Sequence, residues 1–389
     1  MEGDFLAHKP LNFLEVPFSS PQFRPFSPRD FAVSLSEWFS ASQREMPWRR
    51  EENFSDPYRI LVSEIMLQQT TVAAVTPFFE RFTARFPDVA SLANALESDV
   101  LEMWAGLGYY SRARNLHGAA KRVMELHNGQ FPTEFDAILA LPGVGRYTAG
   151  AVASIALGQR KPIVDANVAR VLSRVLLIDS DLKTAQNQAK LWDGATQIVE
   201  VDEVMPREIN PALMELGALV CTPKNPRCEV CPVATWCEAR AQNRQNEIPF
   251  IAPKAAPTPL FDVCAFAQNE HGEVLLRKRG ADARWWQSMW ELPRVTCDHG
   301  ETGEAALHKL GAQLSLKWEI GDEIAQFKHG VTRYAITLAV LEARIVHLEA
   351  SEDVQWFSFE KAHRLALPSS MKSLLKTLEK GGARQLRLL

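Results

Sequence analysis

"EFDAILALPGVGRYTAGAVASIAL", residues 134–157, decides the fold of the N-terminal half of this chain. The pattern predicts a helix, a tight turn and a second helix, with Gly143 and Gly145 on either side of Val144. Such a turn leaves backbone N–H groups free at the start of the second helix, where they can hold a phosphate. No Gly-Lys-Ser/Thr follows, so the turn is not a nucleotide-binding P-loop. A plain connection between two helices is the alternative.

The pattern of apolar residues divides the chain into a helical part and an α+β part. From about residue 29 to residue 241 apolar residues recur at helical spacing. The proline-rich "IPFIAPKAAPTPL", residues 248–260, indicates an extended linker. Beyond the linker, strands are predicted at "FDVCAFAQ" (261–268), "GEVLLRKR" (272–279) and "TRYAITLAVLEAR" (332–344), and helices near residues 301–310 and 359–380.

Composition limits the class of protein. The net charge of −4 over 389 residues argues against indiscriminate polyanion binding, although a local basic face can still exist. The sequence has no apolar run of the roughly 18 residues that a membrane span needs. "MEGDFLAHKPLNFLEVPF", residues 1–18, lacks the basic start and apolar stretch of a signal peptide. We therefore expect a soluble protein inside the cell, without membrane contact.

Four of the six cysteines form the sharpest motif. Cys221, Cys228, Cys231 and Cys237 stand as C-x6-C-x2-C-x5-C within one short stretch. Four thiolates on such a loop can close around a tetrahedral metal ion or an iron–sulfur cluster, and thiolate ligands suit both zinc and iron. The residues alone leave that choice open.

Two carboxylates stand where apolar residues or caps are expected. Glu64 interrupts the apolar helix "FSDPYRILVSEIML" (54–67), so its pKa should be raised and its proton retained. Asp165, in "RKPIVDANVARVLSR" (160–174), precedes a helix, where N–H donors should favour its charged form. An acid and an anion of this kind can cleave a glycosidic bond. A core glutamate with a structural partner and a simple N-cap are the alternatives, and the spacing alone does not bring the two residues together.

Together these motifs resemble the MutY family of adenine DNA glycosylases, within the helix–hairpin–helix superfamily that includes endonuclease III. The motifs occur in the family's order over about half of the chain: "MPWRR" (46–50), "SEIMLQQT" (63–70), "GLGYYSRARNL" (106–116), "LPGVGRYTAG" (141–150), "VDANVARVLSR" (164–174) and "NPALMELGALVCTP" (210–223). The resemblance implies a multidomain fold: an all-α helix–hairpin–helix glycosylase core with an iron–sulfur cluster loop, followed by an α+β Nudix-like domain. It also implies a 4Fe–4S cluster on the four cysteines.

The resemblance further implies the domain boundaries. An N-terminal extension (1–28) precedes the helical glycosylase domain (29–246), a linker (247–259) and the Nudix-like lesion-recognition domain (260–389). Within the helical domain we expect a six-helix barrel at about 51–163 and a cluster subdomain made of 29–50 and 164–246. Double-stranded DNA should lie across the cleft between them, with the target nucleotide flipped out of the stack.

Residue roles follow from the matched positions. Glu64 would be the general acid, Asp165 would stay ionised beside the oxocarbenium-like sugar, and Asn167 would orient Asp165. Gly143 and Gly145 would grip the DNA backbone. The remaining substrate-binding residues are the adenine-pocket residues Trp48, Arg49, Leu67 and Glu215, with Gln68 beside them, and the duplex-wedging residues Gln69 and Tyr109.

Tyr147 bears on the reaction type. Bifunctional endonuclease III enzymes carry a lysine nucleophile two residues after the second glycine of the hairpin, and here that position is Tyr147. Without an amine there, we expect a monofunctional glycosylase. Tyr109 and Tyr110 also stand beside Arg112 and Arg114, which suits base stacking and phosphate contact or, alternatively, a solvated cationic face.

The C-terminal part resembles the Nudix-like module that reads 8-oxoguanine in the same family, chiefly at "RWWQSMWELPR" (284–294). "RVTCDHGETGEAALHKL" (294–310) lacks the carboxylate-rich R-E-x-x-E-E helix that binds magnesium, so we expect recognition and no hydrolysis there. The family's Phe-Ser-His loop aligns with Val331, Thr332 and Arg333, where Thr332 keeps a hydroxyl and Arg333 a donor for the lesion.

The leading hypothesis is excision of adenine mispaired with 8-oxoguanine, and more weakly with guanine, by a monomeric enzyme. A related glycosylase for another mispaired base, such as thymine opposite guanine, is one alternative. A non-catalytic, cluster-bearing DNA-binding protein is another, and a nucleotide-pool hydrolase is the least favoured. We expect the protein in a bacterial cytoplasm at the nucleoid, or in the nucleus or mitochondria of a eukaryotic host.

Overall fold

The computed structural model describes residues 23–250, 256–280, 282–349 and 351–380 and divides into two compact units. The cysteine-bearing unit takes in the chain up to residue 44 together with residues 158–251. The other unit takes in residues 45–157, which we call the helix–hairpin–helix segment, and the C-terminal domain from residue 252 onward. The boundaries expected from the sequence stay predictions. Parts of the predicted extension (1–22), linker (251–255) and C-terminus (381–389) lie outside the described residues.

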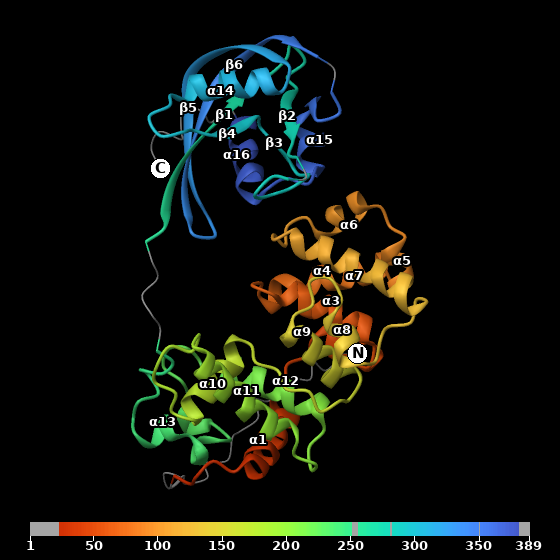
Figure 1. Ribbon diagram of the computed structural model, residues 1–389, viewed down its shortest axis with the longest axis vertical. Helices are drawn as coiled ribbons and strands as arrows, with labels where there is room; N and C mark the ends of the chain where they lie inside the picture. Colours follow the sequence, from red (N-terminus) through yellow and green to blue (C-terminus); the bar gives the residue numbers. More distant parts are fainter. Residues whose placement is uncertain (1–22, 251–255, 281, 350, 381–389) are drawn as a thin grey trace, which may run out of the picture. The chain divides into compact units, whose positions relative to one another are not determined.

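The two helical parts consist of short and medium helices, drawn in red to green in Figure 1. The cysteine-bearing unit contains α1 (Pro28–Ser42), α10 (Ala166–Val175), α11 (Ala185–Val199), α12 (Pro206–Leu219), η3 (Cys228–Val230), η4 (Ala234–Trp236) and α13 (Glu238–Ala241). The helix–hairpin–helix segment contains η1 (Pro47–Arg49), α2 (Glu51–Phe54), α3 (Pro57–Leu67), α4 (Val72–Arg85), α5 (Val89–Ala93), α6 (Glu97–Trp104), α7 (Ser111–His127), α8 (Phe135–Leu139), α9 (Arg146–Ala151) and the π-helical turn η2 (Val152–Ala156). Among the described helices, none is both long and apolar enough to cross a membrane.

Helix α3 is buried almost all round, which explains how it can carry Glu64 into the interior. The Asp56 carboxylate caps it by accepting hydrogen bonds from the N–H groups of Tyr58 and Arg59, at 2.9 and 3.4 Å. Pro57 occupies the first helical position, where its missing N–H costs nothing. The helix itself agrees with the prediction from the sequence.

The predicted helix–turn–helix is confirmed as α8, a tight turn, and α9 continued by η2. Gly143 has a φ of +73°, and a Cβ built there would lie 2.5 Å from Cβ of Asn115 on α7. Only glycine satisfies both constraints. Gly145 is the N-cap of α9, so the turn ends where the helix begins.

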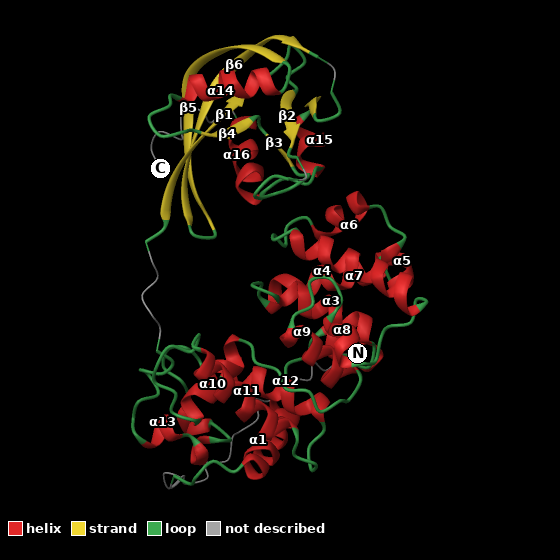
Figure 2. Ribbon diagram, in the orientation of Figure 1, coloured by secondary structure: helices red, strands yellow, loops and turns green. Residues whose placement is uncertain are grey.

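The C-terminal domain is an α+β domain, and Figure 2 shows that the described strands all belong to it. Its elements are β1 (Thr258–Phe266), β2 (Val274–Lys278), β3 (Trp290–Glu291), β4 (Arg294–Thr296), α14 (Gly303–Gln313), β5 (Leu316–Val331), β6 (Tyr334–Leu348), β7 (Val354–Phe357), α15 (Phe359–Arg364) and α16 (Ser369–Glu379). One sheet has the strand order β4-β1-β6-β5, with β1 and β6 parallel and the other pairs antiparallel. The second has the order β3-β2-β7 and is antiparallel.

Alternation along β1 builds a core on each face of the larger sheet. Cys264 packs into a cluster with residues of α15 and α16, whereas Val263 and Ala265 pack into a cluster with residues of α14. The period of two in a strand sends neighbouring side chains to opposite faces, so the sheet needs a helical layer on each side. Figure 1 shows α14 and α16 on either side of the strands.

The long strand β5 is absent from the sequence prediction. Its stretch "LKWEIGDEIAQFKHGV" mixes charged with apolar residues and is mostly exposed or half-buried. Its pairing with β6 also shifts register between Ile320 and Glu323, which breaks the alternation that would reveal a strand. The strand predicted from residue 332 is also wrong at its start. Val331 pairs with Tyr334, so Thr332 and Arg333 form the tip of the β5–β6 hairpin.

Candidate active site and metal centre

Glu64 lies on α3 with only 4% of its surface exposed. The hydroxyl of Tyr147, the second residue of α9, donates a hydrogen bond to Oε2 of Glu64 over 2.6 Å. Packing of α9 against α3 thus joins residues that are 83 positions apart in the sequence. A carboxyl group in apolar surroundings, with one oxygen fixed by a hydroxyl, is suited to proton transfer.

Trp48 and Arg49 lie on η1, in the same segment as Glu64. Asn53 fixes this turn by donating its side-chain amide to the carbonyl oxygen of Pro47 over 2.6 Å. The buried ring of Trp48 packs edge-on against Phe79 of α4, with 5.5 Å between the ring centroids. Of the two adenine-pocket residues predicted on η1, Trp48 is therefore held by packing.

Two exposed side chains of this segment sit on strained backbone. Leu67 ends α3 and Gln68 follows it, and Gln69 then has a φ of +58°. Tyr109 has a φ of +48° and a 57% exposed side chain. Left-handed backbone is uncommon for non-glycine residues and marks strain that the surroundings must hold.

Arg112 corrects an expectation from the sequence. It is 7% exposed, so it is neither a phosphate contact nor part of a solvated cationic face. Its guanidinium group instead donates to carbonyl oxygens of the two loops that carry Gln69 and Tyr109. The sequence showed a cation beside two tyrosines, but not the direction in which its side chain points.

Asp165 is the N-cap of α10, as predicted. Its carboxylate accepts hydrogen bonds from the Val168 N–H at 2.7 Å and from Nδ2 of Asn167 at 3.0 Å. The expected direction of its pKa is wrong, however. Desolvation raises the pKa of Asp165 above its ordinary value and outweighs these donors, which act to lower it.

Arg170 joins Asn167 to the cysteine loop. Its Nη2 donates to Oδ1 of Asn167 and to the carbonyl oxygen of Gly217, both at 2.8 Å, and its Nε donates to the carbonyl oxygen of Cys221 at 2.8 Å. Gly217 is needed there, because a Cβ on it would lie 2.6 Å from Cβ of Asn167. Helix α12 therefore packs directly on the start of α10.

Glu215 on α12 is 1% exposed and is paired with Arg44. Nε of Arg44 lies 2.6 Å from Oε1 and Nη2 lies 3.0 Å from Oε2, while the Arg44 N–H donates to Oε1 at 3.2 Å. A two-pronged contact of this kind fixes the orientation of a carboxylate. The pair raises the pKa of Arg44, chiefly through the hydrogen bond to Glu215.

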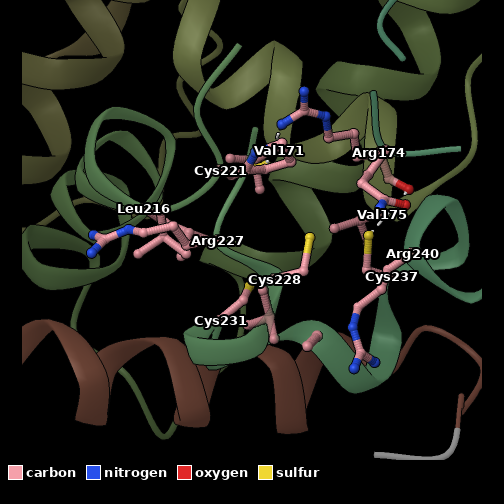
Figure 3. Close-up of a pocket in the computed structure, with 15 residues that line it drawn as sticks. Val171, Arg174, Val175, Leu216, Cys221, Arg227, Cys228, Cys231, Cys237 and Arg240 are labelled. Carbon is pink, nitrogen blue, oxygen red and sulfur yellow. Dashed lines mark hydrogen bonds between the residues drawn. The ribbon is translucent and has the colours of Figure 1, made fainter. Parts of the chain in front are cut away.

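The four predicted cysteine ligands line one cavity, shown in Figure 3 with Arg174 beside them. Nη1 of Arg174 lies 3.2 Å from Sγ of Cys221, and the same guanidinium group donates to the carbonyl oxygens of Thr222 and Ile248, both at 2.8 Å. Over the described residues, no three His, Cys, Asp or Glu side chains are close enough to share a single metal ion.

This donor set fits an iron–sulfur cluster. Burial raises the pKa values of the Cys228 and Cys231 thiols, and that of Cys237 to about 11, so these sulfurs need a metal's positive charge to become thiolates. The nearby guanidinium group of Arg174 adds further positive charge. When bound, the cluster would cross-link the loop from Cys221 to Cys237.

At the tip of the β5–β6 hairpin, Thr332 has a φ of +51°. Arg333 donates from Nε and Nη2 to the hydroxyl of Tyr334, at 3.1 and 2.9 Å. Thr332 and Arg333 therefore lie together at this tip, and their contact with the lesion stays a prediction.

The structure therefore brings the predicted residues together in groups. Glu64, Tyr147, Trp48 and Arg49 share the helix–hairpin–helix segment, whereas Asp165, Asn167, Glu215 and the cysteines share the cysteine-bearing unit. Sequence reasoning missed Arg44, Arg170, Arg174 and Gly217. Their positions inside or next to the quoted motifs were the available signal, since each lies within seven residues of a predicted site residue.

Three family models match the chain. Residues 62–196 match the HhH-GPD superfamily base excision DNA repair protein, residues 221–237 the iron–sulfur binding domain of endonuclease III, and residues 263–377 the NUDIX domain. The adenine DNA glycosylase of Homo sapiens is 32% identical over 90% of this chain and 74% of that protein. This chain belongs to the adenine DNA glycosylase family.

A second relative and a solved structure are also similar to this chain. The adenine DNA glycosylase of Buchnera aphidicola subsp. Baizongia pistaciae (strain Bp) is 36% identical over 90% of this chain and 97% of its own. The solved structure of a thermostable thymine-DNA glycosylase is similar to 55% of this chain and 97% of its own, with 30% identity and a TM-score of 0.50. This member of the family is a DNA-binding base-excision-repair glycosylase with an iron–sulfur site on its cysteines.

Replacing Cys228 with serine should remove the cluster, because a serine hydroxyl is a poor ligand for iron. We expect Cys228→Ser to lose the brown absorbance and most of its iron, and to bind duplex DNA more weakly. Cys297→Ser, which alters a cysteine of the C-terminal domain, is the matched control and should keep both. Full iron content in Cys228→Ser, measured on the purified protein, would contradict the ligand assignment.

Adding a methyl group at Gly217 should push Asn167 and the start of α10 aside. We expect Gly217→Ala to slow the glycosylase roughly 10- to 100-fold, since a displacement of about 1 Å in a site costs that much. Alanine has a higher helix propensity than glycine, so any fall in the melting temperature of Gly217→Ala cannot come from helix propensity. Ala218→Ser, one position on and exposed, should stay within about twofold of wild type by the same single-turnover assay. A wild-type rate for Gly217→Ala would show that the contact can relax.

Proposed function

We propose that the protein removes adenine mispaired with 8-oxoguanine, and more weakly with guanine, from double-stranded DNA as a monomer. The nucleotide is flipped out of the duplex and its N-glycosidic bond is hydrolysed. The buried Glu64 carboxyl group, held by the Tyr147 hydroxyl at 2.6 Å, is the observation that carries the proposal. The adenine DNA glycosylases among the relatives support adenine as the base.

Glu64 acts as the general acid. Its proton goes to a nitrogen of the purine's imidazole ring, and the electron pair of the breaking glycosidic bond goes to the base, which leaves as neutral adenine. The Tyr147 hydroxyl then stabilises the carboxylate that remains on Glu64, because it already donates to Oε2. The apolar helix around Glu64 excludes water from this transfer.

Asp165 stabilises the sugar cation that the leaving base creates. Its carboxylate is oriented by the Val168 N–H and by Asn167, and Asn167 is in turn held by Arg170. An anion fixed in advance by such donors needs little reorganisation when positive charge develops at the sugar. Water then attacks the sugar carbon, and the proton that it loses goes to the Glu64 carboxylate, which restores the acid and completes the hydrolysis.

Substrate recognition is divided among several groups. Trp48, Arg49, Leu67 and Gln68 border the adenine, and Glu215, which Arg44 orients, accepts a hydrogen bond from its amino group. Backbone N–H groups at the Gly143–Gly145 turn hold a phosphate. Gln69 and Tyr109 wedge into the duplex, and Thr332 with Arg333 contacts the 8-oxoguanine.

The reaction is monofunctional. Cleavage of the strand by β-elimination needs an amine that forms a Schiff base with the sugar. At the position of that amine stands Tyr147, whose hydroxyl is engaged with Glu64. The product is therefore an abasic site in an intact strand.

Excision of thymine opposite guanine is the second candidate, favoured by the similarity to a thymine-DNA glycosylase structure. That structure corresponds to 55% of this chain, whereas the human adenine DNA glycosylase corresponds to 90%. The extent of the second match favours adenine. A non-catalytic DNA-binding role is disfavoured, because Glu64 and Tyr147 remain in contact at 2.6 Å.

Single-turnover excision from labelled duplexes tests the proposal. The duplexes pair adenine with 8-oxoguanine, guanine or thymine, or thymine with guanine, and each sample is quenched with and without hot alkali. We expect strand breaks only after alkali, and fastest for adenine opposite 8-oxoguanine. Glu64→Gln should lower that rate by about 10²- to 10⁴-fold while duplex affinity stays near wild type.

Other outcomes of this assay separate the alternatives. Breaks without alkali would mean a lyase, and faster loss of thymine would favour the second candidate. If Glu64→Gln loses folding and binding together, Glu64 is a core residue and not the acid.

Replacing Asp165 with asparagine should lower the excision rate and raise the stability of the folded protein. Asparagine can still accept the Val168 N–H but carries no charge, so excision should fall about 10³-fold or more. Because burial raises the folded-state pKa of Asp165, its ionisation destabilises the folded protein. Asp165→Asn should therefore melt at a higher temperature than wild type at neutral pH.

The direction of the pKa shift at Asp165 determines the pH range in which Asp165→Asn is more stable than wild type. The stability advantage of Asp165→Asn should be absent below the ordinary pKa of 3.8, grow as pH rises toward the raised folded-state pKa, and be complete above it. Thermal melts of both proteins between pH 3 and pH 8 measure it. A lower melting temperature for Asp165→Asn at pH 7 would contradict the prediction.

A further inference from the structure

Arg112, the second residue of α7, joins two loops that are about 40 residues apart. Its Nη1 donates to the carbonyl oxygens of Ile65 and Met66, both at 2.9 Å, and of Gln68 at 2.5 Å. These carbonyl groups belong to the C-terminal end of α3 and the residue after it, where a helix leaves its last acceptors without intrahelical donors. A cation is also favoured there by the helix dipole.

The other side of the same guanidinium group holds the second loop. Its Nη2 donates to the carbonyl oxygens of Leu107 and Gly108, at 3.1 and 3.2 Å, and to the Thr70 hydroxyl at 3.3 Å. We call Arg112 and these six acceptors the Arg112 clamp. The two NH2 groups of the planar guanidinium can span two loops in this way, whereas the compact ammonium of a lysine cannot.

The clamp lies beside both residues that are proposed to wedge into the duplex. Gln69 stands between two of its acceptors, Gln68 and Thr70, and Tyr109 directly follows a third. The Arg112 guanidinium carbon is also 5.4 Å from the centroid of the Tyr109 ring.

Both wedge residues need support, because both have left-handed backbone without being glycine, with φ of +58° at Gln69 and +48° at Tyr109. Both side chains are also exposed, so their burial contributes little of that support.

We propose that Arg112 is a positioning residue that holds the Gln69 and Tyr109 loops as one preformed wedge for opening the base pair. This inference rests on the proposed function, since it takes the wedge roles of Gln69 and Tyr109 from there. It adds that the two loops depend on a single buried side chain, and that losing it should slow nucleotide flipping before any chemistry occurs.

Amide hydrogen exchange of the full-length, cluster-containing protein without DNA tests the clamp itself. Arg112→Lys should speed exchange in residues 66–71 and 105–110 together, by about tenfold or more. Arg122→Met, which removes an exposed cation from the same helix, is the matched control and should change neither segment. Unchanged exchange in either segment of Arg112→Lys would overturn the clamp.

Stopped-flow fluorescence tests whether the Arg112 clamp contributes to nucleotide flipping. The duplex carries 2-aminopurine beside a target 2′-fluoro-2′-deoxyadenosine opposite 8-oxoguanine, so that flipping is seen while the glycosidic bond stays intact. We expect the unstacking rate to fall about tenfold or more in Arg112→Lys and further in Arg112→Met, with the Arg122→Met rate near wild type. Faster exchange with an unchanged unstacking rate would overturn the wedge role.

Two controls keep the outcomes distinguishable. If Arg112→Met loses its cooperative melt or its cluster absorbance, Arg112→Lys alone decides. If the wild type neither unstacks nor excises adenine opposite 8-oxoguanine, the proposed function fails and the wedge role with it, while the exchange experiment still decides whether the clamp exists. Normal excision by the wild type together with normal flipping by Arg112→Lys overturns this inference alone.

Discussion

Hydrogen bonds from arginine side chains to backbone carbonyl groups hold the helical parts of this protein in place. Arg112 joins two loops, and Arg170 joins α10 to α12 and to the cysteine loop. Arg174 donates a hydrogen bond to a carbonyl oxygen of that same loop. Removing a guanidinium group from water costs several kcal/mol, and hydrogen bonds to a charged donor return about 1.5–3 kcal/mol each. Because carbonyl groups do not neutralise the charge, positive potential persists beside the thiols and beside the exposed loops.

Three buried or half-buried carboxyl groups of the predicted site lie in three different environments. Glu64 has an apolar helix and a hydroxyl, Asp165 has a helix N-terminus and an amide, and Glu215 has a guanidinium group that contacts both of its oxygens. Each environment fixes its carboxyl group in a different way: one hydroxyl contacts Glu64, two donors orient Asp165 although desolvation raises its pKa, and a two-pronged ion pair holds Glu215. The chemistry thus follows from the partners of otherwise similar side chains.

Much of this could be read from the sequence where the signal is local. The hairpin glycines, the cap at Asp165, the interrupted helix at Glu64 and the cysteine spacing all depend on neighbouring residues, and the structure has each of these features. The N-cap position alone gave the wrong direction for the pKa of Asp165, because the desolvation that raises this pKa depends on packing by distant segments.

The rest could not be predicted because it depends on contacts between distant segments. Arg44 meets Glu215 across 171 positions, and Arg112 reaches Gln68 across 44. Long charged side chains are usually solvated, so no periodicity marks the few that turn inward. Strand β5 was not predicted for a related reason. Its register is set by its partner β6, and the charged residues within it obscure the alternation of apolar and polar positions.

Helix α9 is only six residues long, yet it begins at the hairpin turn and carries Tyr147 as its second residue. The Gly145 cap and the hydroxyl that fixes Glu64 therefore belong to one rigid turn of backbone. In the proposed function this turn binds a phosphate and Glu64 delivers the proton. Free energy released by binding at the turn would then act directly on the hydroxyl that contacts the carboxyl group.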